Sequence, residues 1–374
     1  MKKTKLYNVH KKLNAKIIDF AGFLMPVQYT SIIAEHKAVR NSVGVFDVSH
    51  MGEIFIEGEG SLDFIQHITI NDASKLFAGR VQYSAMCYSD GGIVDDLLVY
   101  KFNNNKFMFV VNAANIEKDF NWMNENLDFR LNGNVFDIKI NNFSNEYSLI
   151  AVQGPNSKEV ILRICDSDLE KQKIEELEYY YFTIAKAAGI EMIISRTGYT
   201  GEIGYELYFT GDDSDAEKIW NAIFDSGKEF NIEPAGLAAR DSLRLEMGFC
   251  LYGNDIDKTT NPLEAGLGWI TKLKKDEFIG KDALLKIKSE GLIRKLSPMV
   301  SEEKAFPRHG YDITANGEKI GTITSGTVSP VLDKPIALGY IDSDFASEGS
   351  EVNFSIRGKE IPAKVVKLPF INKN

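Results

Sequence analysis

Three apolar runs follow one another between Val81 and Val111, and short polar turns separate them. The runs cover residues 81–88, 93–102 and 106–111, and the turns between them consist of Ser, Asp, Gly and Asn. Apolar runs of this length joined by such turns are typical of strands in β-hairpins. This part of the chain is therefore predicted to form an antiparallel meander.

Helices and further strands are predicted on both sides of the meander. Helical spacing of apolar residues predicts helices over residues 112–127, 157–165, 215–226 and 236–248. Ser61 is placed as the N-cap of another helix, Ser214 and Glu217 have the spacing of a capping box, and Gly227 is expected to end that helix in the C′ role. Short strands are expected at residues 53–57, 147–152, 191–196 and 205–209.

Hairpin signals dominate the C-terminal part of the chain. Asn316-Gly317 and Arg357-Gly358 each separate short runs of strand-forming residues. A succession of short strands of this kind predicts a small β-barrel or sandwich. The expected fold class is therefore α+β, with two α+β regions built on antiparallel sheets and a small C-terminal β-barrel.

Composition narrows the possible functions. The chain has 374 residues, of which 44% are hydrophobic and 26% charged, which is ordinary for a globular protein and excludes a disordered, collagen-like or coiled-coil chain. With 43 basic and 53 acidic residues the formal charge is −10, so nucleic acid is not expected as a partner. No apolar stretch approaches the ~18 residues of a membrane span, and no secretory signal is recognised. The three cysteines, Cys87, Cys165 and Cys250, are widely spaced, which favours reduced thiols and a cytoplasmic location.

Familiar cofactor and nucleophile motifs are absent from the sequence. It contains no dinucleotide-binding glycine pattern, phosphate-binding loop, Cys-x-x-Cys pair, zinc-protease motif or serine nucleophile elbow. The histidines, which lie at positions 10, 36, 50, 67 and 309, do not pair at metal-ligand spacing. Neither a metal site nor a serine or cysteine nucleophile is therefore expected.

Asp95 and Asp96 lie inside a predicted strand, where aspartate is depleted. Side chains alternate between the two faces of a strand, so Lys101 shares the face of Asp95 while Asp96 shares the other face with apolar residues. The lysine suggests that the Asp95 face is nearer to solvent. Asp96 is then the better candidate for a carboxylate in an apolar pocket, where an acid or base is tuned. A bulge or a turn cap is the alternative for the pair, and the local signal alone favours it.

A glycine-rich loop at residues 196–206 contains two tyrosines, Tyr199 and Tyr205, and ends on Glu206. Glycines allow the backbone to approach a ligand closely, and the tyrosines could frame a flat ring. A carboxylate at Glu206 could accept two N–H bonds from an amino-pyrimidine edge. An ordinary hairpin with a solvent-facing glutamate explains the local pattern equally well.

Arg240 and Arg244 lie four residues apart, on one face of a predicted helix. Two positive charges at this spacing favour a nearby anion, which is either a carboxylate ligand or an acidic residue of the protein. A salt bridge to this acidic chain is the simpler explanation for Arg244, whereas Arg240 is the better candidate for a ligand. His50 lies at a possible pocket edge, although a lone histidine is more often a hydrogen-bonded structural residue. The three cysteines are expected to pack in cores.

Several segments, in the same order along the chain, resemble the glycine cleavage T-protein family of tetrahydrofolate-dependent aminomethyltransferases. These segments are residues 19–29, 46–52, 91–96, 196–202, 235–241 and 251–255. The resemblance implies a cloverleaf of three domains, with residues 1–280 forming the folate-binding region, a second subdomain within it at roughly 53–140, and a barrel at 285–374. It also implies transfer of the aminomethyl carbon from the lipoyl arm of the H protein to tetrahydrofolate by a cytoplasmic monomer, with release of ammonia and formation of 5,10-methylenetetrahydrofolate and dihydrolipoyl protein.

The resemblance assigns roles residue by residue. Asp96 matches the catalytic aspartate, which agrees with the alternation argument, and Glu206 matches the pterin anchor. The remaining matched residues would form the folate and substrate pocket: Met51, Tyr83, Tyr100, Val110, Asn112, Tyr199 and Arg240. Family members often carry Arg or Tyr near the C-terminus for the glutamate tail of folate; here Lys367 or Lys373 would have to replace them.

Two other functions remain open from the sequence. A folate-dependent demethylase of the same superfamily is one, although those relatives do not keep the Gly-Gly-Ile-Val-Asp-Asp pattern that this chain has at 91–96. A non-catalytic folate-binding assembly factor is the other. Its relatives carry a cysteine motif near the last domain boundary, and the corresponding residues 278–281 contain no cysteine.

Overall fold

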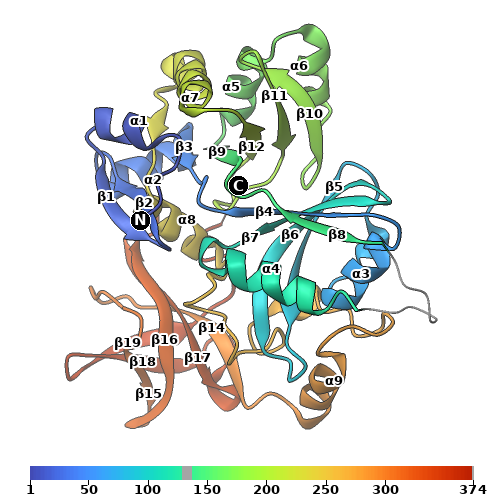
Figure 1. Ribbon diagram of the computed structural model, residues 1–374. Coiled ribbons are helices and arrows are strands. Elements are labelled where there is room, and N and C mark those ends of the chain that lie inside the picture. Colours follow the sequence, from blue (N-terminus) through green and yellow to red (C-terminus); the bar gives the residue numbers. More distant parts are fainter. Residues whose placement is uncertain (129–136, 373–374) are drawn as a thin grey trace. The chain divides into compact units, whose positions relative to one another are not determined.

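The computed structural model describes residues 1–128 and 137–372 and is shown in Figure 1. The chain forms two compact units, and each unit draws on several segments of the sequence. Unit 1 comprises Met1–His67, Ala73–Tyr83 and Leu97–Arg240, and unit 2 comprises Ile68–Asp72, Ser84–Asp96 and Asp241–Asn374. The domain boundaries expected from the sequence, 1–280 and 285–374, stay a prediction.

The α-helices lie mainly in the first two thirds of the chain. Their bounds are α1 Tyr7–Lys12, α2 Ile32–Asn41, α3 Ser61–Ile68, α4 Ile116–Glu125, α5 Ser157–Ile164, α6 Asp168–Glu175, α7 Asp213–Gly227, α8 Leu237–Met247 and α9 Lys281–Glu290. Among the described residues, no helix is both long enough and apolar enough to cross a lipid bilayer.

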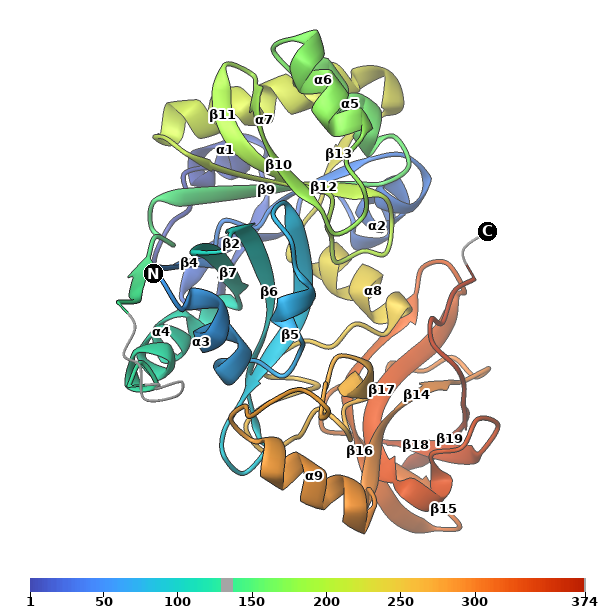
Figure 2. The same ribbon diagram turned by 90° about the vertical axis from the view of Figure 1, so that its right-hand side faces the viewer.

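The predicted meander is confirmed. It consists of β5 (Arg80–Cys87), β6 (Ile93–Asn103) and β7 (Lys106–Val111), and β4 (Gly52–Glu57) and β8 (Lys139–Asn142) complete the sheet in the order β5-β6-β7-β4-β8. Figure 2 shows β5 and β6 side by side. The division between the two units passes through β5 and β6, so Tyr83 and Tyr100 belong to unit 1 while Asp96 belongs to unit 2.

A second sheet lies within unit 1, in the order β10-β11-β12-β9-β3-β13. Its strands are β3 Gly44–Asp47, β9 Tyr147–Gln153, β10 Phe182–Ala187, β11 Ile190–Ser195, β12 Gly204–Thr210 and β13 Glu233–Pro234. All of its pairs are antiparallel except β3 with β13. Helices α5 and α7 lie beside this sheet (Figure 1). Their apolar residues pack with those of the strands in a core that buries Trp220 and Phe209. A separate hairpin joins β1 (Lys16–Phe20) to β2 (Phe23–Gln28).

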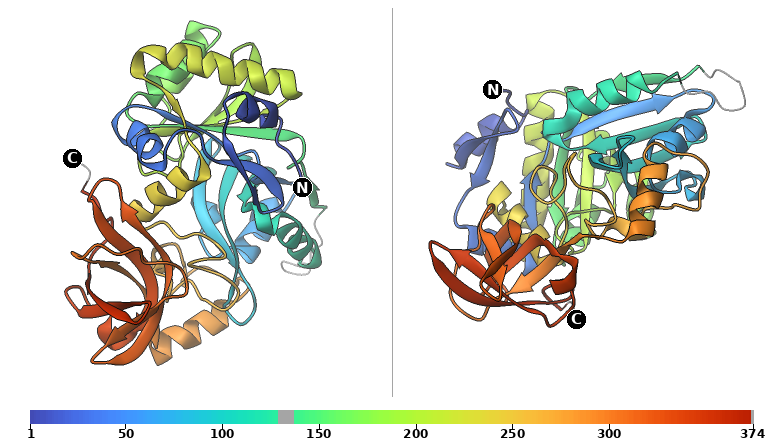
Figure 3. Two further views of the ribbon diagram at one scale, coloured as in Figure 1. Left: turned by 90° about the vertical axis from the view of Figure 1, so that its left-hand side faces the viewer. Right: turned by 90° about the horizontal axis from the view of Figure 1, so that it is seen from below.

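The C-terminal strands of unit 2 form a closed barrel, in the order β14-β17-β16-β15-β18-β19 (Figure 3, orange to red). Their bounds are β14 Arg294–Val300, β15 Asp312–Ala315, β16 Glu318–Ser329, β17 Lys334–Asp342, β18 Glu351–Ile356 and β19 Lys359–Val365. Both predicted hairpins are present, and Asn316 and Gly317 both have positive φ, as a two-residue turn of this kind requires. The predicted α+β class with antiparallel sheets and a C-terminal barrel is therefore confirmed.

Helix boundaries differ from the prediction at three places. The capping box of α7 is formed by Asp212 and Asp215, because the helix begins two residues earlier than the sequence suggested. Gly227 is the last residue of α7 and has φ −94°, and the left-handed residue is Asn231, which follows a further short turn. Ser61 is the first residue of α3, and its hydroxyl donates to the carbonyl of Gly58 instead of serving as the predicted N-cap.

Candidate functional site

Glu206 lies in β12 of unit 1, opposite Ser195 of β11 and Ala151 of β9. Its side chain is half-buried. Thr197 and Tyr208 both donate their hydroxyls to Oε2 of this carboxylate, the latter at 3.4 Å. A carboxylate has about four acceptor positions, so Oε1 can still accept N–H donors from a ligand.

Buried hydroxyl groups extend this network away from Glu206. The hydroxyl oxygens of Tyr100 and Tyr208 lie 2.9 Å apart, and Tyr100 also donates to Oγ of Ser195 at 3.2 Å. The hydroxyl oxygens of Thr197 and Ser195 lie 3.0 Å apart. Tyr100 comes from β6 of the other sheet, so hydrogen bonds join the two sheets of unit 1 beside Glu206.

The surroundings of Glu206 raise its pKa above the ordinary value of 4.5. Burial is the largest cause, because it disfavours the charged form. The Thr197 hydroxyl, the positive charge of Arg240 and the Tyr208 hydroxyl act in the opposite direction and favour the carboxylate. A ligand that donates hydrogen bonds to this group would favour the carboxylate further.

The loop between β11 and β12 approaches the Gln153 side chain closely. A Cβ atom at Gly198 would lie 2.0 Å from Gln153 Oε1, and one at Gly204 would lie 2.2 Å from Gln153 Nε2. A side chain at either position would therefore displace the Gln153 amide. The same amide is held by Thr200, which donates to Oε1 at 2.9 Å, and Gln153 donates to the carbonyl of Thr197 at 3.2 Å.

Arg240 lies in the unit 1 part of α8, and its guanidinium carbon is 4.5 Å from the centroid of the Tyr199 ring. The start of this helix is fixed by the buried Glu35, because the backbone N–H of Gly236 donates to Glu35 Oε2 at 2.8 Å. A cation that stacks on an aromatic ring and acts electrostatically on a nearby carboxylate is suited to a flat, polar ligand.

His50 is buried, and within the part of the chain that the structure describes its Nδ1 has no hydrogen-bond partner. The expectation of a hydrogen-bonded structural histidine therefore does not hold for this atom. Burial, and then the nearby charge of Arg240, lower the pKa of His50 to about 3, while Asp47 opposes the shift. His50 is accordingly a neutral imidazole at physiological pH.

The other predicted pocket residues of unit 1 lie on separate elements. Met51 immediately precedes β4, Val110 is buried in β7, and Asn112 follows β7. Tyr83 lies in β5. The structure therefore brings together Glu206, Tyr100, Tyr199 and Arg240, whereas the roles of these other residues stay predictions.

Asp96 lies in the unit 2 part of β6, and its predicted face is wrong. Asp95 is fully buried and Asp96 is half-buried, so the Asp95 face is the more enclosed of the two. Lys101 misled the prediction because its side chain is also buried: its ammonium group donates to the carbonyl of Leu76 at 2.9 Å. The catalytic assignment of Asp96 thus depends on the resemblance and not on the alternation argument.

Arg244 is a structural residue, as the simpler interpretation predicted. It is 1% exposed, and it donates to Asp255 at 2.6 Å and to Ser325 at 2.8 Å within unit 2. Cys87, Cys165 and Cys250 are buried and form no disulfide, which confirms the expectation of core packing. In residues 1–128 and 137–372, no three His, Cys, Asp or Glu side chains converge so that they could hold a metal ion.

The sequence reasoning missed Ser195, Thr197 and Tyr208. One signal for them exists: Tyr208 is two residues after Glu206 on the same strand face, and Ser195 and Thr197 are also two apart. Lys367 is paired with Glu348 at 2.8 Å on the surface of unit 2, and Lys373 lies outside the described residues.

Two family models together match most of this chain. Residues 6–275 match the family model described as the GCVT N-terminal domain, and residues 294–372 match that of the glycine cleavage T-protein C-terminal barrel domain. The chain belongs to the glycine cleavage T-protein family. It is therefore an enzyme, an aminomethyltransferase.

Individual members of the T-protein family agree with this assignment over their whole length. The aminomethyltransferase of Halothermothrix orenii is 51% identical over 371 residues, which cover 99% of this chain and 100% of the relative. That of Flavobacterium psychrophilum is 51% identical and covers 100% of both chains. The crystal structure of the glycine cleavage system aminomethyltransferase T from Bartonella henselae superimposes on this chain with a TM-score of 0.89 at 32% sequence identity. The match covers 99% of this chain and 98% of the Bartonella chain.

Proposed function

We propose that this aminomethyltransferase moves the aminomethyl carbon from the lipoyl arm of the H protein to tetrahydrofolate. The carbon leaves its sulfur and its nitrogen and becomes bonded to the two folate nitrogens, N5 and N10. The two protons lost by these nitrogens leave with the ammonia and the lipoyl thiol. The products are 5,10-methylenetetrahydrofolate, ammonia and dihydrolipoyl protein.

The single observation that supports this function best is the arrangement at Glu206. The half-buried carboxylate accepts two hydroxyl donors on Oε2, and its Oε1 can accept the N–H groups of a pterin. Burial raises the pKa of Glu206, and Arg240, which stacks on Tyr199, opposes this shift and thereby favours the ionised, accepting form. In this proposal Glu206 anchors the pterin, and Tyr100, Tyr199 and Arg240 line the folate pocket together with Met51, Tyr83, Val110 and Asn112.

Asp96 is the proposed catalytic residue. Its carboxylate would orient the folate nitrogens and take up a proton as ammonia departs. The half-buried position of Asp96 agrees with access to a substrate. No metal takes part in this proposal.

The partners in this proposal are the lipoylated H protein and folate, and nucleic acid and membrane have no part in it. We propose that the enzyme acts as a monomer in the cytoplasm, where the three free cysteines would remain reduced. The glutamate tail of folate would be held by Lys367 or Lys373.

A coupled assay tests the proposed function. The purified protein is mixed with aminomethylated, lipoylated H protein, with and without tetrahydrofolate, and ammonia and methylenetetrahydrofolate are followed together. Production of both that depends on folate is the expected result. Folate binding without turnover would contradict it, and methylated sulfonium and amine donors would then test the demethylase; failure with those donors as well would leave the non-catalytic binding factor.

A further inference from the structure

The strand that carries Asp96 is held at its start by a loop of unit 2. The backbone N–H of Ile93, the first residue of β6, donates to the carbonyls of Thr260 at 3.0 Å and Asp257 at 3.3 Å. The hydroxyl of Tyr252 donates to the carbonyl of Ile93 at 3.2 Å. Both backbone polar groups of Ile93, three residues before Asp96, are therefore bound by residues 252–260.

A close backbone contact reinforces this attachment. A Cβ atom at Gly92 would lie 2.2 Å from the carbonyl oxygen of Lys258, so the loop backbone lies directly against the hairpin before β6. Strands rise by about 3.3 Å per residue, and an extended backbone transmits a displacement at Ile93 to Asp96. Burial raises the pKa of the Cys250 thiol, and the charges of Asp255 and Asp96 add to this shift, so Asp96 acts electrostatically on a residue close in sequence to Tyr252.

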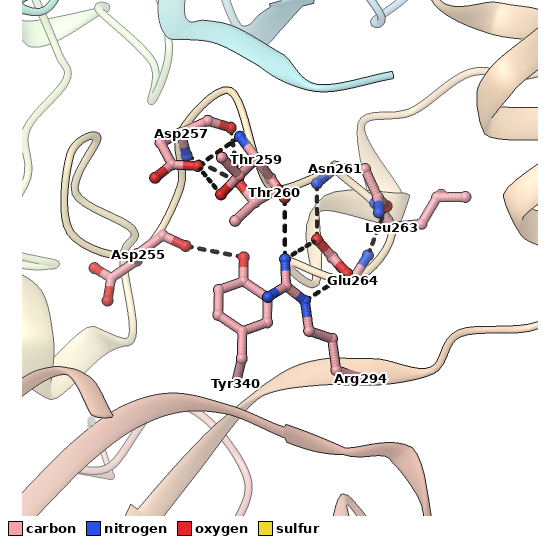
Figure 4. Close-up of polar contacts among 9 residues, drawn as sticks. All are labelled: Asp255, Asp257, Thr259, Thr260, Asn261, Leu263, Glu264, Arg294 and Tyr340. Atoms are coloured by element: carbon pink, nitrogen blue, oxygen red, sulfur yellow. Dashed lines mark hydrogen bonds and ion pairs between the residues drawn. The ribbon is translucent and has the colours of Figure 1, made fainter. Parts of the chain in front are cut away.

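The loop is itself attached to the barrel through Arg294 and Tyr340, as Figure 4 shows. Arg294 in β14 donates from Nε and Nη2 to the two carboxylate oxygens of Glu264 at 3.1 and 3.0 Å, and also to the carbonyl of Thr259 at 3.0 Å. Its guanidinium lies 4.7 Å from the ring centroid of Tyr340, whose hydroxyl donates to the carbonyl of Asp255 at 2.9 Å. A bidentate pair of this kind has fixed geometry.

Short hydrogen bonds within the loop keep it rigid between these two attachments. Asp257 accepts from the backbone N–H of Thr259 at 2.7 Å, and its own N–H donates to the Thr260 hydroxyl at 2.8 Å. Asn261 accepts from the N–H of Glu264 at 3.1 Å, next to the Arg294 pair (Figure 4). The barrel, the loop and the start of β6 thus form one continuous connection inside unit 2.

We propose that Tyr252 and Arg294 are positioning residues for catalysis, which hold Asp96 in place through this loop. The inference rests on the proposed function, because it needs Asp96 to act on the substrate. Tyr252 fixes the strand to the loop, and Arg294 fixes the loop to the barrel. Neither residue needs to touch the substrate for this effect.

The first test is Tyr252→Phe, which removes one hydroxyl and keeps the ring. A misplacement of about 1 Å at a reacting group can reduce the rate by roughly 10²-fold, so a decrease in kcat of about tenfold or more is expected, with the KM for folate unchanged. Hydrogen exchange at the amides of residues 93–96 should become faster. The matched control is Tyr311→Phe, since Tyr311 packs against the barrel core, and it should leave kcat unchanged.

A double-mutant cycle with Arg294→Lys tests whether the two residues act through one loop. Each single variant should have a lower kcat at saturating substrates. The double variant should be no slower than the more affected of the two single variants. Rate losses that simply multiply would show independent effects and overturn the shared connection. Melting temperatures measured in parallel separate a loss of folding from a loss of rate.

The outcomes separate this inference from the proposed function. Normal kcat and unchanged exchange in Tyr252→Phe, in an enzyme that Asp96→Asn inactivates, overturn the positioning inference alone. Full turnover of Asp96→Asn overturns the proposed role of Asp96, and the inference fails with it. If the wild-type protein shows no turnover at all, the proposed function fails; exchange at residues 93–96 still decides whether Tyr252 fixes the strand.

Discussion

The guanidinium carbon of Arg240 lies 4.5 Å from the centroid of the Tyr199 ring. Burial raises the pKa of Glu206 and lowers that of His50, and the positive charge of Arg240 opposes the first shift and adds to the second. One side chain thereby connects the glycine-rich loop, the proposed pterin anchor and a buried neutral histidine. All four residues belong to unit 1.

Arg240→Lys is expected to weaken folate binding. Lysine keeps the charge but lacks the planar group that stacks on Tyr199. Cation–π contacts contribute about 0.5–2 kcal/mol, so a loss of affinity of roughly tenfold is expected. Titration of folate fluorescence would measure it, with the exposed Arg163→Lys as the control. Equal folate affinity in the two variants would contradict a role of the Arg240–Tyr199 stack in folate binding.

Glu206→Gln is expected to remove a pH dependence of folate binding. The pKa of Glu206 is raised above 4.5 in the free protein, and a donor ligand binds the ionised form. Affinity of the wild-type protein should therefore fall as the pH decreases through that raised pKa, in addition to the titration of folate itself. The glutamine variant should bind more weakly at neutral pH and keep only the folate titration. Identical pH profiles for the two proteins would contradict the pterin anchor.

Asp96→Asn should retain the fold and folate binding and lose most of the turnover. The substitution removes only the charge and the proton acceptor, and general acid–base groups contribute typically 10²–10⁴-fold. The coupled assay gives kcat, and folate titration gives the dissociation constant. Its matched control is Asp90→Asn at the exposed turn before β6, which should stay active.

His50 should make the protein less stable in acid. Its pKa is about 3 in the folded protein against 6.5 normally, so the unfolded chain takes up a proton first as the pH falls. The contribution of neutral His50 to the free energy of unfolding is fully present above pH 6.5. It is lost progressively as the pH falls to about 3, by up to about 5 kcal/mol. Urea unfolding of His50→Gln should show a shallower decrease over this range, and the exposed His309→Gln should follow the wild-type protein.

Arg244→Ala is expected to destabilise unit 2. The buried guanidinium pairs with Asp255 at 2.6 Å, and its removal leaves that buried carboxylate without its main counter-charge. Breaking a buried pair in this way costs about 3–5 kcal/mol. Denaturant unfolding would measure the loss, and Arg163→Ala on the surface of α5 should change the midpoint little. A midpoint equal to that of the Arg163 variant would contradict the structural role of Arg244.

The meander, the barrel and the hairpins could be predicted from the sequence, because they depend on local patterns. Asn316-Gly317 determines its turn through backbone angles that few other pairs adopt, and β5, β6 and β7 are recognised by apolar runs between polar turns. The structural role of Arg244 was also predicted correctly, since the acidic chain offers it a partner, whereas the folate-binding role of Arg240 stays a prediction.

Burial was predicted less well where a charged side chain is enclosed. Lys101 suggested an exposed face, yet its ammonium group finds the carbonyl of Leu76 and the whole side chain is buried. The capping box of α7 was predicted two residues too late for a different reason. Asp212 and Ser214 can both cap a helix, and the local sequence does not choose between them.

The sequence by itself determined the fold class, the family and the residue types at the candidate site, because motifs and hairpin signals are written in neighbouring residues. Only the tertiary structure decided that Thr197, Tyr208 and Tyr100 surround the proposed pterin anchor and that residues 252–260 hold the start of β6. Those contacts join residues far apart in the chain, for example Tyr252 to Ile93, 159 positions away. Hydrogen bonds between distant segments form only when packing brings their donors and acceptors within about 3 Å, and no local pattern specifies which will meet.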